Sequence, residues 1–388
     1  MRNLHFIKYE ALNMKELNNP FVVYGYKGAA YFCDREKETE KIVKGLLNER
    51  NITLIAPRRI GKTGLIHHVF ARIKEQQSEI CCIYFDILAT KTLEHFVQLM
   101  ARNVLGRLDT PSQTALRKVQ DFFSAFRPTM TFDANTGMPT FSIDISKSQE
   151  EMSLQRIFEY IKLSNKRCYI AIDEFQQIMN YPGTDTEALL RSFIQFVPNA
   201  YFIFAGSKQH MMSDIFLSPD RPLYQGAQIV NIKEIDEHTY YEFANAMFSK
   251  KNQNLPESVF HYLYNKVDGQ TWYIQATMNR VYSNQTAEIS DTDVDEAINE
   301  LIDEEEVAFE NYYSSLTNNQ AALLVAIAKE KQVKSPMAQT FISKYNLPAL
   351  SSIKMALKSL LESQFVYQYQ GVYVVYDRFF GMWLRERI

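Results

Sequence analysis

The chain has 388 residues, of which 46% are hydrophobic and 22% charged, a balance typical of folded proteins rather than disordered ones. Its net charge of −3 at pH 7 argues against a protein coated in basic surface for nucleic acid, although a local basic patch stays open. A chain of this length is expected to form two or three domains.

The cysteines and the apolar runs indicate the cellular compartment of the protein. Its four cysteines show neither metal-ligand spacing nor a disulfide framework; they are Cys33, Cys81, Cys82 and Cys168. Such a pattern favours a reducing compartment. The N-terminal stretch lacks the features of a signal peptide, and no apolar run reaches the ~20 residues of a membrane span. We therefore expect a cytoplasmic protein without a membrane partner.

Apolar runs alternate with helical patterns in the first part of the chain. Continuous hydrophobicity predicts strands buried on both faces of a parallel sheet. These runs are 51–56, 81–87, 168–173, 201–207 and, more weakly, 228–232. Helices are predicted over 63–76, 93–108, 154–163 and 187–196. The alternation indicates an α/β fold, with a β-hairpin insertion around an Asn-Thr-Gly turn near 130–145.

The pattern becomes helical after residue 232. Residues 233–317 read as a helical region, whose acidic run at 303–306 is interpreted as a solvated helix face. From residue 318 onward, three predicted helices precede a hairpin with a glycine turn, which is the outline of a winged helix. We therefore expect three parts, at 1–232, 233–317 and 318–388.

The segment "APRRIGKTG" follows the first predicted strand and opens the first helix of the α/β part. It fits the Walker A phosphate-binding spacing if alanine replaces the first glycine. Lys62 would reach the β- and γ-phosphates, and the Thr63 hydroxyl would hold Mg²⁺. The predicted nucleotide contacts are Ala56, Pro57, Arg58, Arg59, Ile60, Gly61, Lys62, Thr63 and Gly64.

A second acidic motif ends another buried strand. Asp173 and Glu174 follow the apolar run "CYIAI", which is the Walker B arrangement. Asp173 would hold Mg²⁺, and Glu174 would polarise the attacking water. ATP or ADP with Mg²⁺ are therefore the predicted cofactors.

Two further residues fit a catalytic role by position. Ser207, after the fourth strand, would touch the γ-phosphate or the attacking water; the alternative is a simple helix N-cap. Arg221 would act as an arginine finger on the nucleotide of a neighbouring subunit; the alternative is an ordinary surface arginine.

These motifs resemble those of AAA+-type P-loop ATPases, and more narrowly the archaeal ATPase group near the STAND signalling ATPases. The resemblance rests on "FCDREKETEKIVKGL", "APRRIGKTGLI", "IAIDEFQQI", "FIFAGS", "RPLY" and "GQTWYIQ". It implies a five-stranded sheet with the Walker A strand central and the Walker B strand one strand removed. It implies as well that the helical region 233–317 is a lid and that a winged helix follows it. It also implies that Phe32 and Arg35 lie on the adenine side, although a salt bridge at a helix start is equally open for Arg35. Arg58 and Arg59 match a loop that contacts phosphate or a neighbouring domain, with solvent-facing positions as the alternative.

The leading interpretation is an ATP-hydrolysing switch that couples the nucleotide state to domain movement. One alternative is a DNA-binding ATPase that uses the mildly basic winged helix, where Lys354 and Lys358 lie on the third helix. That helix offers no arginine for guanine readout, which favours contact with a protein partner or a role in sensing the lid. A homo-oligomer stays open as a further partner. The other alternative is a module that holds nucleotide without hydrolysing it.

Overall fold

The computed structural model describes residues 16–108, 128–132, 139–143, 150–183, 185–284, 287–369 and 371–388. The chain divides into two compact units. One is Tyr24–Asp236, and the other combines the chain before Tyr24 with Glu237–Ile388. The predicted boundaries at 232 and 317 stay a proposal.

The unit Tyr24–Asp236 is built on a parallel sheet of five strands in the order β2-β5-β6-β1-β7. These strands are β1 (Ile52–Ile55), β2 (Cys81–Asp86), β5 (Cys168–Asp173), β6 (Ala200–Gly206) and β7 (Gln228–Asn231). The Walker B strand β5 lies one strand from the Walker A strand β1, as the resemblance implies. The expectation that β1 occupies the centre is wrong, because β7 alone lies beyond β1 and β6 is the middle strand.

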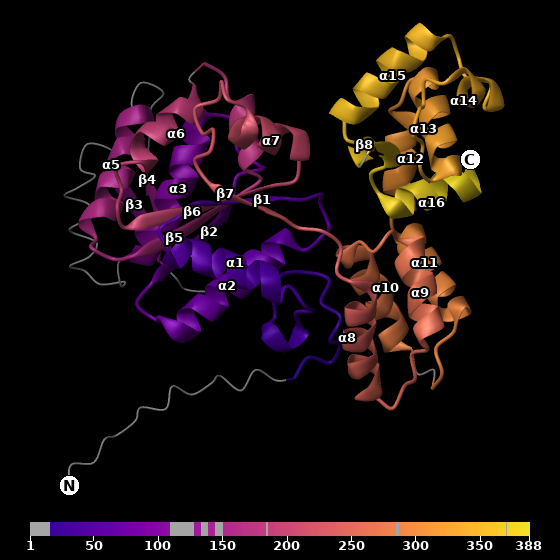
Figure 1. Cartoon of the computed structure of the whole chain (residues 1–388), viewed down its shortest axis with the longest axis horizontal. Helices are drawn as coiled ribbons and strands as arrows, with labels where there is room; N and C mark the ends of the chain where they lie inside the picture. The colour runs from indigo at the N-terminus through magenta and orange to yellow at the C-terminus, as the bar shows by residue number, and fades with distance from the viewer. Residues whose placement is uncertain are drawn as a thin grey trace. The chain divides into compact units, whose positions relative to one another are not determined.

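Helices cover both faces of this sheet (Figure 1). On one face lie α1 (Glu36–Leu47) and α2 (Lys62–Gln76), which pack on Ile52 and Leu54 of β1. The other face is covered by α3 (Leu93–Leu108), α5 (Glu150–Leu163), α6 (Thr186–Ile194) and α7 (Gln209–Leu217). Alternate residues of each strand enter the two cores, which is why the strand runs are continuously apolar.

The predicted insertion contains two paired strands. β3 (Pro128–Phe132) pairs antiparallel with β4 (Pro139–Ile143), and Met130 lies opposite Phe141. The Asn-Thr-Gly turn predicted between them lies outside the described residues.

In the second unit, four helices occupy the first part of the predicted lid, up to Glu304. They are α8 (Glu237–Ser249), α9 (Glu257–Lys266), α10 (Thr271–Ser283) and α11 (Asp291–Glu304). The segment before Tyr24 joins this unit, because Phe21 packs on Phe248 and Tyr282 and its carbonyl oxygen accepts from Asn279.

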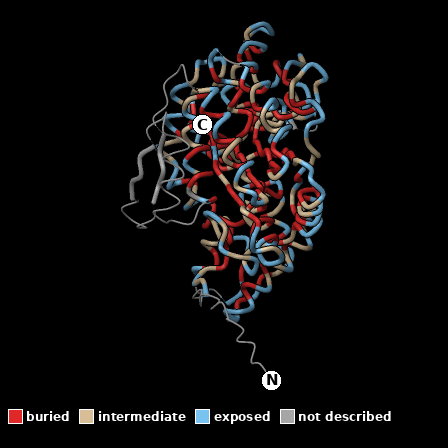
Figure 2. Tube along the Cα trace, turned by 90° about the vertical axis from the view of Figure 1, so that its left-hand side faces the viewer, coloured by how far each residue is buried: buried red, intermediate tan, exposed pale blue. Residues whose placement is uncertain are grey.

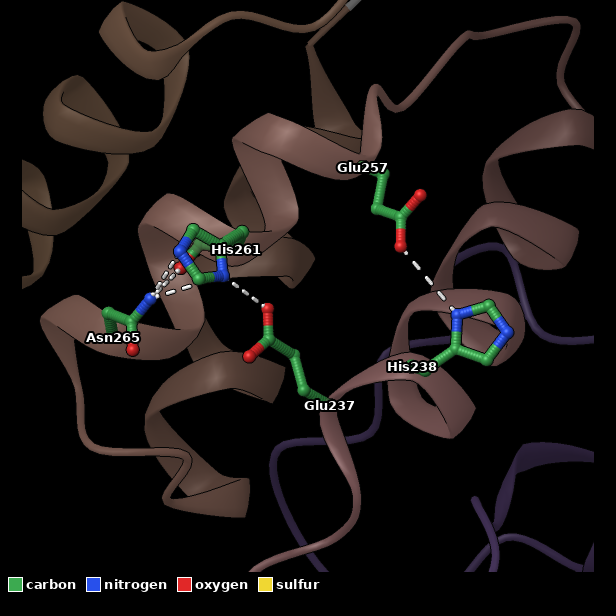
Figure 3. Close-up of polar contacts among 5 residues, drawn as sticks. All are labelled: Glu237, His238, Glu257, His261 and Asn265. Atoms are coloured by element: carbon green, nitrogen blue, oxygen red, sulfur yellow. Dashed lines mark hydrogen bonds and ion pairs between the residues drawn. The ribbon is translucent and has the colours of Figure 1, made fainter.

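Exposed polar contacts connect the start of α8 to α9 (Figure 3). The His261 Nδ1 atom lies 2.6 Å from Glu237 Oε1, and the Asn265 amide contacts the same imidazole. His238 lies beside Glu257 in the same view. Within the described ranges, no group of three or more His, Cys, Asp or Glu is arranged to hold a metal ion, and these contacts form no such group.

The rest of the second unit is a winged helix. It contains α12 (Glu306–Ser314), α13 (Asn318–Glu330), α14 (Gln339–Lys344), α15 (Leu350–Glu362) and the wing strands β8 (Val366–Tyr369) and β9 (Val372–Val375). A further helix, α16 (Arg378–Arg387), follows the wing and was not expected. Asp377 caps it, and it buries Phe379, Phe380 and Trp383. In the acidic run at 303–306, Asp303, Glu304 and Glu305 are exposed and Glu306 is half-buried, and Arg387 pairs with Asp303 and Glu306.

Buried and exposed residues alternate along the helices of the chain (Figure 2). In the part of the chain that the structure describes, no helix has the length and hydrophobicity needed to span a bilayer.

Candidate functional site

The loop between β1 and α2 carries the predicted phosphate cradle. β1 is buried throughout, and α2 begins at Lys62, directly after Gly61. Gly61 has φ 95° and ψ 20°, a left-handed conformation that glycine adopts without steric cost. Ala56 is buried and does not have a positive φ, so its methyl group is tolerated where the motif has glycine. The free N–H groups at the start of α2 suit an anionic phosphate.

Lys62 is buried in this loop. Its ammonium donates to the carbonyl oxygens of Ala56, at 2.9 Å, and Pro57, at 2.8 Å. Burial lowers the pKa of Lys62 to about 8, while the nearby carboxylates of Glu174 and Asp173 raise it. A buried lysine beside two carboxylates carries a positive charge at neutral pH that a phosphate would stabilise.

The predicted magnesium ligands lie together. The Thr63 hydroxyl donates to Asp173 Oδ2 at 2.8 Å, so the first turn of α2 and the end of β5 meet. Tyr84 of β2 also donates to Asp173 Oδ2, at 3.0 Å. A hydroxyl and a carboxylate are oxygen ligands that Mg²⁺ prefers, so these residues fit the ion. The sequence pattern gives no sign of Tyr84, because its role depends on the pairing of β2 with β5.

Glu174 is held by two polar side chains. It follows β5 with φ 54°, and its Oε2 atom accepts from the Ser207 hydroxyl and from the Gln176 amide, each at 2.6 Å. Arg58 of the phosphate loop donates from Nε to the Ser207 hydroxyl oxygen at 3.4 Å. The N-cap of α7 is Lys208, so Ser207 does not take the alternative role of helix cap. Ser207 instead connects the phosphate loop to Glu174.

Gln176 is a site residue that sequence reasoning missed. Its side chain is buried, and it lies in a short 3-10 helix, Phe175–Asn180, immediately after Glu174. A Cβ atom on Gly206 would lie 2.3 Å from Gln176 Oε1, so glycine at the end of β6 leaves the room that this side chain needs. In the sequence, only Gly206 before Ser207 could indicate a side chain packed against this position. The sequence does not show that this side chain is Gln176, because the contact depends on the pairing of β5 with β6.

Phe32 and Arg35 lie next to the phosphate loop. Phe32 stacks on His68 of α2 with ring centroids 4.4 Å apart, and a Cβ atom on Gly64 would lie 3.4 Å from the Phe32 ring. Arg35 is buried and donates to the carbonyl oxygens of Ile60, at 3.2 Å, and Lys233, at 2.6 Å. It also pairs with Glu38, so the open alternative of a helix-start salt bridge describes one of its contacts. Arg35 thus connects the phosphate loop to the segment that follows β7.

Arg221 contacts carboxylates of α6 and α7. Its guanidinium lies 2.6 Å from Oε2 of Glu187, a buried carboxylate at the start of α6, and 3.9 Å from Asp214. The other Glu187 oxygen accepts from the Leu223 backbone N–H at 3.0 Å. The arginine is therefore part of a contact between α6, α7 and the loop before β7, and the hydrogen-bonded group around Asp173 and Glu174 does not include it.

The structure thus brings together the predicted Arg58, Lys62, Thr63, Asp173, Glu174 and Ser207, and it adds Tyr84 and Gln176. Arg59 takes a left-handed conformation with φ 65° in the phosphate loop. Chemically, this group offers a cation for phosphate, oxygen ligands for a hard divalent ion, and a carboxylate that can accept a proton.

Two family models match the chain. Residues 32–277 match an ATPase domain found predominantly in Archaea, and residues 307–386 match a probable winged helix domain. No curated protein matches the chain significantly by sequence.

Solved structures share the fold at low sequence identity. The Walker-type ATPase PABY2304 of Pyrococcus abyssi is 18% identical, covers 94% of this chain and 99% of its own, and has a TM-score of 0.64. The ORC2 protein of Aeropyrum pernix, in ADPNP and ADP complexes, is 15% identical with a TM-score of 0.57 and covers 91% of this chain and 92% of its own. The ORC1 protein of Aeropyrum pernix, in complex with DNA, is 12% identical with a TM-score of 0.53 and the same coverages. These likenesses establish a P-loop ATPase fold followed by a winged helix.

Proposed function

Because the chain belongs to the family of ATPase domains found predominantly in Archaea, we propose that it binds and hydrolyses ATP and acts as a nucleotide-dependent switch. One observation carries this proposal: Lys62, Thr63, Asp173 and Glu174 lie close enough to interact at one edge of the sheet. Membership of the AAA+ class, affinity to the STAND group and a cytoplasmic location are parts of the same proposal.

Each site residue has a distinct part in ATP binding. Lys62 would exchange its two carbonyl contacts for oxygens of the β- and γ-phosphates. Thr63 and Asp173 would hold Mg²⁺, which neutralises charge on the phosphates when it is bound. Tyr84 donates to the Asp173 oxygen that also accepts from Thr63, and so fixes that carboxylate's orientation.

Glu174 is the group proposed to accept the proton of the attacking water. Its Oε2 atom is engaged by Ser207 and Gln176, which fixes the carboxylate at the end of β5. Arg58 contacts the same Ser207 hydroxyl, so a γ-phosphate that draws Arg58 or Ser207 away would change how Glu174 is held. This gives Arg58 a role in linking nucleotide binding to the catalytic carboxylate.

The switch part of the proposal is supported by contacts within the second unit. The Arg378 guanidinium at the start of α16 lies 2.7 Å from Asp268, which precedes α10, and its side chain is largely buried. The Arg378 backbone N–H donates to the buried Tyr273 hydroxyl of α10 at 2.9 Å. These contacts tie the winged helix to the lid helices, so the two are expected to move as one body when the nucleotide state changes.

Small-angle X-ray scattering of the Glu174→Gln variant tests the switch. This variant is designed to bind ATP without converting it, so its scattering profile is expected to change on addition of MgATP and to revert with ADP. The Lys62→Ala variant is the control and is expected to show no change. Identical profiles with and without bound ATP would contradict a movement of domains.

The same experiment reports on the proposed partner. A second copy of the chain, with Arg221 acting on its neighbour's nucleotide, requires Arg221 to leave Glu187. Scattering extrapolated to zero angle gives the mass, so an ATP-dependent doubling supports self-association. A mass of one chain in every nucleotide state would contradict the proposal that Arg221 acts on the nucleotide of a neighbouring copy.

DNA binding is the second candidate function, and the exposed face of α15 favours it. Ser351, Lys354 and Lys358 are exposed along this face of the third helix of the winged helix. The same face also exposes Leu350 and Met355, which are apolar and suit protein contact.

The double variant Lys354→Ala/Lys358→Ala tests this function. If α15 contacts phosphates, the variant is expected to reduce the slope of log affinity against log salt concentration by about 2. Fluorescence anisotropy with a labelled duplex measures the slope, and Lys37→Ala/Lys44→Ala on α1 is the matched control. Equal slopes for both double variants would contradict contact between α15 and DNA phosphates.

A further inference from the structure

Two cysteines lie side by side at the start of β2 and β5. In the parallel register of these strands, Cys81 is paired directly with Cys168. Both pack in the core on the α3 and α5 face of the sheet, whereas Cys82 belongs to the core on the α1 and α2 face. The neighbouring Cys82 therefore points away from the pair and is a natural internal control.

The spacing of this pair suits a disulfide bond. Neighbouring strands in a sheet lie about 4.8 Å apart, which falls inside the range of about 4.4–6.8 Å between the Cα atoms of disulfide-bonded cysteines. Each thiol donates to a backbone carbonyl near the start of its strand, Cys81 to Arg107 at 3.7 Å and Cys168 to Lys166 at 3.4 Å. Both thiols are reduced in the structure, Cys81 partly exposed and Cys168 buried.

The surroundings of Cys81 favour its thiolate. Three positive charges act on it: Lys74 on α2, Arg107 in the last turn of α3, and Lys166 just before β5. The adjacent Cys168 side chain and these charges lower the pKa of Cys81 to about 7, against the effect of burial. Burial instead raises the pKa of Cys82 to about 12. Thiolate character and access to solvent are what make a cysteine reactive.

We propose that Cys81 and Cys168 form an oxidative modification site, in which a hydroperoxide oxidises Cys81 and Cys168 resolves the product as a disulfide between β2 and β5. The Cys81 thiolate attacks the peroxide, the O–O bond breaks, and a sulfenic acid and hydroxide (or alkoxide) form. The Cys168 sulfur then attacks the Cys81 sulfur, the S–O bond breaks, and water leaves. Two thiols lose two electrons in total, and the peroxide gains them.

This site is separate from the proposed ATP site. Cys81 and Cys168 begin their strands, and the same two strands end at the paired Asp86 and Asp173. The inference therefore does not depend on ATP hydrolysis, and its failure would leave the proposed function untouched.

Mass spectrometry of the reduced full-length chain, titrated with hydrogen peroxide, tests the proposal. Tryptic digestion is expected to yield peptide 75–91 linked to peptide 168–191, with the loss of two hydrogens. Because peptide 75–91 contains both Cys81 and Cys82, the experiment is repeated with Cys82→Ser, which is expected to keep the link. Absence of the link in the wild type, or its loss in Cys82→Ser, would overturn the proposal.

A second measurement keeps the test independent of variant folding. The rate of alkylation of Cys81 by iodoacetamide in the wild type is expected to rise with pH around a midpoint near 7, because the thiolate is the nucleophile. In the Cys168→Ser variant, peroxide is expected to leave Cys81 as a sulfenic acid that dimedone traps. Faster alkylation of Cys82 or Cys33 than of Cys81 at pH 7 would contradict the assignment.

Discussion

Replacing Glu174 with glutamine is expected to lower ATP turnover by about 100-fold or more, since loss of a general base typically costs 10²–10⁴ in rate. Glutamine keeps the size of the side chain and its ability to hydrogen bond, so the contacts with Ser207 and Gln176 can persist. Binding of ATP is expected to stay close to that of the wild type. A coupled phosphate-release assay and titration with a fluorescent ATP analogue measure the two quantities.

Glu151→Gln is the matched control for this substitution. Glu151 lies exposed in the first turn of α5, and it takes no part in the hydrogen bonds that hold Glu174. This variant should keep turnover close to the wild-type rate. A Glu174→Gln protein that turns over ATP as fast as Glu151→Gln would remove Glu174 from its proposed role.

Replacing Lys62 with alanine is expected to weaken ATP binding by about 100-fold, since removing one partner of a buried charge contact costs about 2–5 kcal/mol. The loss comes from the ammonium that would contact the phosphates. The pKa of Lys62 lies below its ordinary value, so its positive charge is less favourable in the folded chain than in the unfolded one, and its removal does not take away a stabilising charge. Isothermal titration calorimetry with MgATP measures the effect.

Two comparisons separate binding from folding in this test. Lys41→Ala removes an exposed lysine of α1, whose ammonium contacts the carbonyl oxygen of Ile229, and is expected to leave ATP affinity unchanged. Thermal unfolding followed by circular dichroism should show similar transitions for both variants. Wild-type affinity in folded Lys62→Ala would mean that ATP binds elsewhere.

Local sequence patterns predicted the strands and the two motifs well. β5 has the bounds Cys168–Asp173 that its apolar run indicates, and α3 has the predicted bounds Leu93–Leu108. A strand that is buried on both faces, such as β5, has a continuously apolar sequence, so its bounds can be predicted from the sequence. Gly61 likewise marks a backbone conformation that the sequence alone identifies.

Other features depend on contacts between distant segments. Tyr84 and Asp173 are 89 positions apart and meet only because β2 pairs with β5. The strand order, with β6 rather than β1 in the middle, also follows from how the helices cross over, which a single sequence does not specify. α16 went unpredicted because it is a short segment that begins two residues after the wing and is stabilised by docking of its aromatic side chains.

The departure at Ala56 has a simple structural explanation, and the arginines beside it are more informative. Ala56 occupies a buried position without positive φ, where a methyl group fits. Arg58 reaches Ser207, which donates to Glu174. The phosphate loop is thus in contact with the proposed catalytic carboxylate through one serine, a connection that the order of residues does not reveal.

Phosphate release by the purified wild-type chain, with its bound nucleotide identified at the end of the reaction, tests the central claim most directly. The account predicts continuous release of phosphate from MgATP, its loss on addition of EDTA, and ADP as the nucleotide left on the protein. Bound nucleotide without phosphate release over many hours would contradict it, and would show that this chain holds nucleotide without hydrolysing it.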